Sequence, residues 1–210
     1  MPTPTTPLSR THAAALSRVL DSIPRGYSRY TCGVVAKEKV QRLVEKLHSI
    51  HQVGASPAQR IMRKQRGQAN AVLALYLPEW ADKAHWMMLF TVGELKAHEK
   101  LYSIFDKPWM AWQGYELTRH SYQGGTRWTW RRTRSEMEEF YVMLGHHAKR
   151  RRWDAVGELL ERAARQPGFH GVREQTWRLC QEACKHGYPG ELPFLYYMTK
   201  VSHGERIAVA

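Results

Sequence analysis

The chain has 210 residues, of which 43% are hydrophobic, and its 32 lysines and arginines against 19 acidic residues give a formal net charge of +13. This length suffices for one good core or one domain with a small appendage, and the charge favours polyanionic partners, of which nucleic acid is the commonest. The sequence has no stretch of about 18 apolar residues that would span a membrane, no secretory signal and too few cysteines for a disulfide framework. We therefore expect a cytoplasmic protein without a membrane partner.

The first quarter of the chain predicts a tail and two helices. Residues 1–9 alternate proline and threonine, which is typical of a disordered tail. A short helix is expected after this tail, as far as Leu20, and residues 26–33 then predict a loop or a short strand. Residues 35–52 carry apolar side chains at helical spacing and predict a longer helix.

A basic segment follows. Ser56 and Pro57 favour the start of a helix, with serine as the capping residue and proline in the first turn. Residues 57–66 contain no acid and four cations: Arg60, Arg63, Lys64 and Arg66. A basic helix of this kind suits a phosphate backbone, and a solvated charged face is the alternative.

Two strands and a helix are expected next. Residues 69–77 and 85–92 are mostly apolar and end at Pro78 and Gly93, so they predict the two middle strands of an antiparallel sheet. Residues 94–105 predict a helix, because apolar side chains recur there at helical spacing.

Residues 112–134 predict a β-hairpin that contains five arginines and a single acid. A two-residue turn at Gly124 and Gly125 would place Tyr122 opposite Arg127. The alternation of side chains then separates the tryptophans of this hairpin from most of its cations.

Trp128 and Trp130 share the face of the hairpin that we expect to join the core. The opposite face is expected to meet solvent, and it carries Arg127, Arg131, His120 and Tyr122. Arginine binds phosphate through two parallel hydrogen bonds, and tyrosine stacks on bases. This face is therefore a candidate nucleic-acid contact.

Three helices are expected in the rest of the chain, at residues 135–147, 153–165 and 172–186. Residues 192–201 either return to the sheet or dock as a last helix. The fold class is predicted as α+β, a small antiparallel sheet with packed helices followed by an all-helical C-terminal part. The boundaries are set at an α+β domain of residues 10–134 that includes the hairpin, and a helical region of residues 135–210 packed on it.

Cations of the basic segment, the hairpin and the end of the first C-terminal helix are predicted to contact phosphate. Those at the helix end also have a structural explanation, because cations favour helix C-termini. The predicted contacts are Arg60, Arg63, Lys64, Arg66, Arg119, Arg127, Arg131, Arg132, Arg134, Lys149, Arg150, Arg151 and Arg152.

Three pairs of metal-binding residue types occur at short spacing: His48 and His51, His146 and His147, and Cys180 and Cys184. None has the additional ligands that a zinc site needs. We expect the cysteines to be small buried residues, and we expect neither a metal nor another cofactor.

Two patterns in the sequence are similar to those of nucleases and offer an alternative to simple binding. Glu79 followed by Glu94-x-Lys96 is similar to the acid and E-x-K pattern of metal-dependent nucleases, although their first acid is usually aspartate. A metal-independent endoribonuclease needs only a base, an acid and cations, and His120 and Tyr122 among arginines would supply them.

A resemblance to proteins encoded by bacterial plasmids and other mobile elements is found in two stretches, GYELTRHSYQGGTRWTWRRTRSEMEEF (Gly114–Phe140) and VGASPAQRIMRKQRGQANAVLALY (Val53–Tyr76). It implies a bacterial, cytoplasmic, nucleic-acid-related setting. We therefore expect a DNA- or RNA-binding accessory protein of replication, transfer or regulation. The alternatives are a metal-independent endoribonuclease acting on structured RNA, and a protein-interaction module or inhibitor of a larger protein complex.

Overall fold

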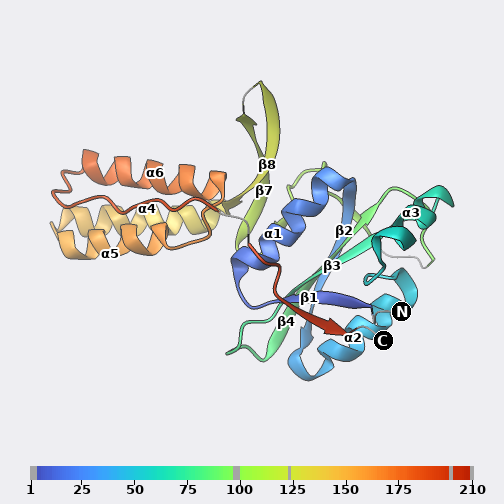
Figure 1. Ribbon diagram of the computed structural model, residues 1–210. Coiled ribbons are helices and arrows are strands. Elements are labelled where there is room, and N and C mark those ends of the chain that lie inside the picture. Colours follow the sequence, from blue (N-terminus) through green and yellow to red (C-terminus); the bar gives the residue numbers. More distant parts are fainter. Residues whose placement is uncertain (1–3, 97–99, 123, 199–200, 209–210) are drawn as a thin grey trace. The chain divides into compact units, whose positions relative to one another are not determined.

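The computed structural model describes residues 4–96, 100–122, 124–198 and 201–208. The chain divides into two compact units (Figure 1): unit 1 is formed by residues 1–108 and 201–210, and unit 2 by residues 109–200. The predicted fold class, α+β with a helical C-terminal part, is confirmed.

Unit 1 contains a mixed sheet whose strands follow the order β5-β2-β4-β3-β1-β9. The pairing of β1 with β3 is parallel, and the other pairs are antiparallel. As predicted, the two apolar strands β3 and β4 pair with each other in the middle of the sheet. The strands are β1 (Thr5–Ser9), β2 (Tyr27–Ala36), β3 (Ala71–Tyr76), β4 (Lys83–Thr91), β5 (Tyr102–Ser103) and β9 (Glu205–Ala208).

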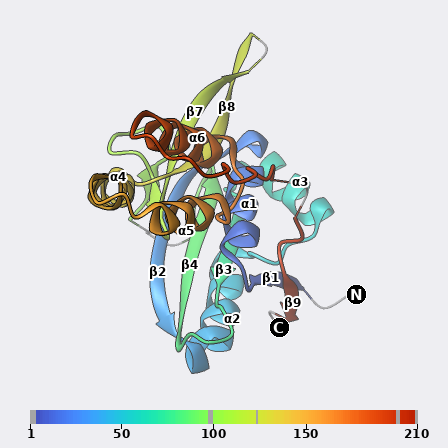
Figure 2. The same ribbon diagram turned by 90° about the vertical axis from the view of Figure 1, so that its left-hand side faces the viewer.

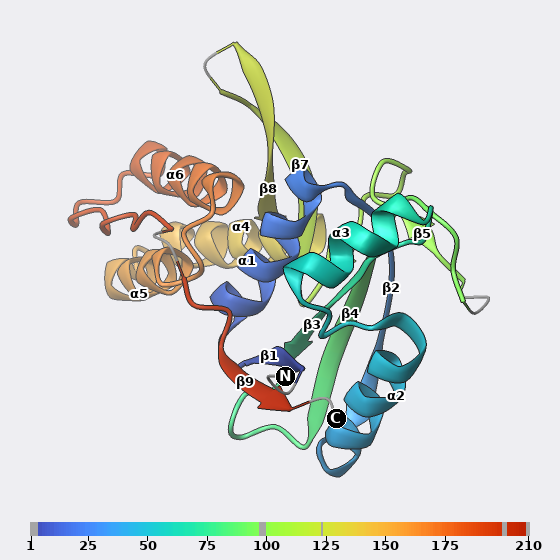
Figure 3. The ribbon, with the colours of Figure 1, turned by 45° about the vertical axis from the view of Figure 1, so that its right-hand side comes forward.

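Three α-helices accompany this sheet (Figure 3): α1 (His12–Ser22), α2 (Val40–His51) and α3 (Pro57–Gln65), with short 3-10 turns at Ile23–Arg25 and Lys37–Lys39. The predicted start of α3 is confirmed by a capping box. Ser56 Oγ accepts the Gln59 N–H at 3.3 Å, and Gln59 Oε1 accepts the Ser56 N–H at 2.7 Å. This box fixes the first turn of the basic helix.

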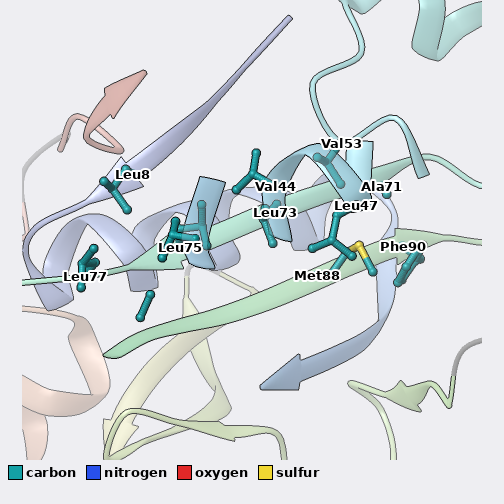
Figure 4. Close-up of a cluster of buried hydrophobic side chains, with 12 residues drawn as sticks. Leu8, Val44, Leu47, Val53, Ala71, Leu73, Leu75, Leu77, Met88 and Phe90 are labelled. Atoms are coloured by element: carbon teal, nitrogen blue, oxygen red, sulfur yellow. The ribbon is translucent and has the colours of Figure 1, made fainter. Parts of the chain in front are cut away.

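The strand β3 is buried on both of its faces. Leu73 and Leu75 belong to a cluster with Val44 and Leu47 of α2 (Figure 4). Residues between them in sequence point to the opposite face and are also buried, and α1 contacts β3. Burial on both faces explains why this strand reads as a continuous apolar run rather than an alternating one.

Three predictions for unit 1 are wrong. Residues 5–9 are strand β1 rather than part of a disordered tail, because they pair with β3 on one side and with β9, from the far end of the chain, on the other. Residues 94–105 do not form the predicted helix within the described part, where Tyr102–Ser103 is the edge strand β5; residues 97–99 lie outside it. The helix predicted from residue 35 begins at Val40, because β2 continues to Ala36.

Unit 2 combines a hairpin with three helices. Figure 1 and Figure 2 show the turn end of the hairpin extending beyond these helices. The predicted apolar stripe of the last helix is confirmed, since Val172, Thr176, Leu179, Cys180 and Ala183 are all buried. The elements are β6 (Ala111–Trp112), β7 (Tyr115–Tyr122), β8 (Gly125–Arg132), α4 (Arg134–Lys149), α5 (Trp153–Ala164) and α6 (His170–Lys185).

The domain boundaries differ from those predicted. The hairpin groups with the C-terminal helices rather than with the first sheet, so the division falls after residue 108 instead of residue 134. The basis is the packing of β8 against the start of α6, where the Gly171 N–H donates to Thr129 Oγ1 at 3.2 Å. Residues 205–208 also leave the helical part and return to the first sheet as β9.

One of the three cysteines is buried. Cys180 is fully buried, as predicted, and burial raises the pKa of its thiol to about 11. Cys184 is exposed, contrary to the prediction, and Cys32 is exposed as well. Because the thiolate is the reactive form, we expect an alkylating reagent at pH 8 to label Cys184 first in the native protein, Cys32 more slowly because burial raises the pKa of its thiol, and Cys180 only after unfolding. Mass spectrometry of digested samples measures this, and rapid native labelling of Cys180 would contradict the burial.

Candidate nucleic-acid interface

Only some of the cations of α3 that were predicted to contact phosphate are exposed to solvent. Lys64 and Arg66 are exposed, Arg60 is half-buried, and Arg63 is buried with 8% exposure. The apolar side chains Ile61 and Met62 are the exposed ones instead. The helix thus turns a guanidinium inward, and the prediction of Arg63 as a surface contact is wrong.

Arg63 joins α3 to its neighbours in unit 1. Its Nη2 donates to the Ala69 carbonyl at 2.6 Å and its Nη1 donates to Gln52 Oε1 at 3.2 Å. Asn70 adds a bond from its Nδ2 to the Arg60 carbonyl at 3.0 Å. The two bonds of Arg63 satisfy the Ala69 carbonyl, just before β3, and the side chain of Gln52, just after α2. Burial also lowers the pKa of Arg63.

A pocket lies beside α3, with a volume of about 420 Å³. It contains Arg63, the exposed cations Arg66 and Lys96, and side chains that are amides or apolar. The lining residues are Gln52, Ala58, Gln59, Met62, Arg63, Arg66, Gln68 and Lys96. The pocket therefore gathers three cations and no carboxylate.

In unit 2, the pairing of β7 with β8 is shifted by two residues from the predicted register. Tyr122 lies opposite Gly125 and His120 opposite Arg127, whereas the predicted turn would place Tyr122 opposite Arg127. A shift of two residues leaves every side chain on its predicted face, because side chains alternate with a period of two. Residue 123 and the side chain of Tyr122 lie outside the described part.

The two tryptophans of β8 differ in burial. Trp130 is fully buried, as predicted, whereas Trp128 is half-buried. The guanidinium of Arg119 lies over the Trp128 ring at 4.4 Å from its centroid, and Trp109 meets the same ring edge-on at 6.1 Å. Arg119 is thus an exposed cation whose guanidinium is positioned by stacking on Trp128.

The solvent face of the hairpin is partly neutralised. Arg131 pairs with Glu116 across the strands, with Nη2 2.9 Å and Nε 3.0 Å from Glu116 Oε2. Arg127 is exposed near the turn. Phosphate would therefore have to compete with the Glu116 carboxylate at Arg131.

His120 stacks on His170, the first residue of α6, with ring centroids 4.0 Å apart and planes inclined by 16°. Partial burial and the charge of His120 lower the pKa of His170. His170 was missed in the sequence because no local motif joins it to the hairpin. Stacked rings leave no space for a phosphate between them, which disfavours an acid and a base acting from opposite sides of one substrate atom.

Arg132 is not a surface residue, contrary to the prediction. Its side chain is fully buried, and its Nε donates to Gln166 Oε1 at 2.6 Å and its Nη2 to the Ala163 carbonyl at 2.5 Å. The Ala163 carbonyl lies in the last turn of α5, where helix carbonyls lack internal partners. Arg132 therefore holds the end of α5 to the hairpin and is structural.

The end of α4 is a basic surface of unit 2. Arg134, at the opposite end of the helix, pairs with Glu138 at 2.7 Å. Lys149, Arg150, Arg151 and Arg152 are consecutive and all exposed, and we call them the basic end of α4. A pocket of about 670 Å³ adjoins them, lined by Tyr141, Val142, Gly145, His146, Lys149 and Arg150. The charge of Arg150 lowers the pKa of His146.

Within the described ranges, no cluster of three or more histidine, cysteine or acidic side chains could hold a metal ion. None of the described helices is both long and apolar enough to cross a membrane. No protein-family model matches the chain, and no curated protein or solved structure is significantly similar to it.

Proposed function

We propose that the protein is a nucleic-acid-binding accessory protein of a bacterial plasmid or mobile element, acting in the cytoplasm. It contacts the phosphate backbone of DNA or RNA through exposed cations in both units: Lys64 and Arg66 on α3, Arg119 and Arg127 on the hairpin, and the basic end of α4. The resemblance of two of these regions to mobile-element proteins supports the setting, and the net charge of +13 supports the class of partner.

The basic end of α4 is the observation that carries this proposal. Its four consecutive cations are exposed, and none forms an ion pair with a carboxylate among the described residues. A helix C-terminus stabilises nearby cations by about 0.3–1 kcal/mol each, and only within its last turn. Stabilisation by the helix dipole therefore explains why one or two of these positions are cationic, whereas attraction to a polyanion explains all four.

A salt series tests this proposal. Binding to duplex DNA, single-stranded DNA and RNA is expected to weaken steeply as salt rises, because each phosphate contact releases counterions. Replacing the four residues Lys149 to Arg152 with glutamine should reduce the slope of log K against log salt by about 3 to 4 on duplex DNA. Fluorescence anisotropy at several salt concentrations measures both quantities.

A matched control removes the same charge from the same unit. Four other exposed cations of unit 2 are ion-paired with glutamates of their own helices: Arg134, Arg165, Arg178 and Lys185. Their joint replacement with glutamine is expected to change the slope by less than about 1, because they already have anionic partners. An equal reduction of the slope in both variants, or binding that does not change with salt, would contradict the proposal.

A metal-independent endoribonuclease is the second candidate, because the structure brings a second histidine to His120. In that case His120 acts on the RNA and His170 positions its ring, because the stacked rings leave no space for a phosphate between them. Cleavage of a structured RNA in the presence of a chelator, abolished in His120→Ala and in His170→Ala, would establish it. Capture of a protein partner without nucleic acid would instead favour the interaction module.

A further inference from the structure

The pocket beside α3 has a chemical composition that suits one kind of ligand. Three cationic side chains line it, from Arg63, Arg66 and Lys96, together with three glutamines and no acid. None of these three cations forms an ion pair with a carboxylate in the part of the chain that the structure describes. The sequence from residue 46 to residue 78 contains no acidic residue at all. The pocket is therefore positively charged and rich in hydrogen-bond donors.

Arg63 is the unusual member of this set. It is 8% exposed, and its guanidinium donates to neutral oxygens, those of Gln52 and Ala69. Its Nε is buried without a hydrogen-bond partner among the described residues. Burying a cation without a counter-ion is costly, and an anion held in the pocket would offset that cost. The two neutral bonds also fix the guanidinium before any ligand arrives.

The number of cations distinguishes between two forms of phosphate. A phosphodiester within a strand carries one charge and two free oxygens, whereas a phosphomonoester carries about −1.5 to −2 and three free oxygens. Three cations around a single pocket match the monoester better. Ala58 and Met62 add an apolar flank that a sugar or base could cover, and a volume of about 420 Å³ falls in the range of small-molecule sites.

We propose that the pocket beside α3 binds a terminal phosphomonoester of a nucleic-acid strand. Arg66 and Lys96 contact its oxygens at the rim, and Arg63 supplies charge from the base of the pocket. This inference rests on the proposed nucleic-acid binding and deepens it, since it assigns α3 to strand ends and leaves backbone contact to unit 2. A free nucleotide presents the same phosphate chemistry, so the test has to separate the two sources.

The experiment compares single-stranded oligonucleotides of one sequence that carry a 5′-phosphate, a 3′-phosphate or only hydroxyl ends, with a nucleoside monophosphate as a fourth ligand. Equilibrium binding to the full-length protein is measured at one salt concentration. We expect one phosphorylated end to raise affinity about tenfold over the hydroxyl oligonucleotide, as one or two charge-assisted hydrogen bonds would. The nucleoside monophosphate alone should bind more weakly, because it lacks the backbone contacts.

Variants within α3 give the matched control. Arg66→Gln and Lys96→Gln are expected to abolish the preference for the phosphorylated end. Lys64→Gln removes an exposed cation of the same helix that does not line the pocket, and it should weaken all oligonucleotides alike and preserve the preference. All three positions are exposed, so the variants are expected to fold.

The outcomes separate the two proposals. Equal affinity for phosphorylated and hydroxyl ends, or a preference that survives in both pocket variants, would overturn the pocket while leaving nucleic-acid binding intact. Tight binding of the nucleoside monophosphate with no gain from a strand would overturn the assignment to strand ends. Failure to bind any oligonucleotide or the nucleotide would overturn both proposals.

Discussion

Replacing Arg132 with methionine is expected to lower the free energy of unfolding of unit 2 by about 3–5 kcal/mol. The guanidinium is fully buried and donates to Gln166, to the Ala163 carbonyl and, at 3.1 Å, to Thr176 Oγ1. Glu136 lies 3.8 Å from its Nε. Methionine fills a similar volume but donates to none of these acceptors. Gln166 Oε1 then keeps only the Tyr115 hydroxyl, the Ala163 carbonyl keeps only the longer bond from Thr176 Oγ1 at 3.4 Å, and Glu136 loses its cation. Each buried polar group that loses its partner costs about 1–3 kcal/mol.

Urea denaturation, followed by alkylation of Cys180, measures this loss, because that thiol is buried in unit 2 and becomes reactive on unfolding. Arg132→Lys should recover only part of the stability, since an ammonium cannot reproduce the planar fork of guanidinium donors. Arg134→Gln is the control: its exposed ion pair with Glu138 is expected to contribute less than about 0.5 kcal/mol. A loss below 1 kcal/mol in Arg132→Met would show that the bonds of Arg132 are not structural.

The burial of Arg132 could have been inferred from the sequence. Residues 128, 130 and 132 share one face of a strand, so the alternation that assigned Trp130 to the core also assigned Arg132 to it. The positive charge alone placed Arg132 among the phosphate contacts. Arg131, one position earlier, lies on the opposite face, where it meets Glu116. For adjacent arginines in a strand, the periodicity predicts burial better than the residue type does.

The inward turn of Arg63 could not have been inferred in this way. On α3 the apolar Ile61 and Met62 are exposed and the cation is buried, which inverts the usual pattern of an amphipathic helix. The partners that make this possible are the Ala69 carbonyl and Gln52, and they come from neighbouring elements rather than from the helix. Hydrophobic periodicity carries no information about such partners.

Local signals predicted more than long-range ones, although the helical spacing at residues 94–105 was misleading. The capping box at Ser56 and the apolar stripe of α6 depend on residues within a few positions of one another, and both predictions are confirmed. Strand β1 depends on β3 and on β9, nearly 200 residues away in sequence (Leu8 pairs with Glu205), so its Pro-Thr composition alone resembled a tail. The pocket beside α3 likewise required Lys96 to meet residues of α3.

Two glycines of unit 2 are expected to respond to alanine in opposite directions. Gly171 lies in the first turn of α6, where an added Cβ would come within 2.6 Å of the Trp130 carbonyl oxygen and 3.1 Å of Arg131 Cβ. A backbone atom cannot yield as a flexible side chain does, so α6 would have to move away from β8. Overpacking of this kind costs about 1–3 kcal/mol, and we expect Gly171→Ala to lower the stability of unit 2 by that amount.

Gly145 is the matched position, a helical glycine of α4 with no heavy atom within 4 Å of an added Cβ. Alanine there is expected to stabilise the unit by about 0.5–1 kcal/mol, since it restricts the unfolded chain without a clash. Urea denaturation of both variants measures whether the free energy of unfolding falls, as expected for Gly171→Ala, or rises, as expected for Gly145→Ala. If Gly171→Ala were neutral, the close approach of β8 to α6 would be wrong. The Thr129–Gly171 bond and the stacking of His120 on His170 would then no longer position the hairpin with Arg119 and Arg127.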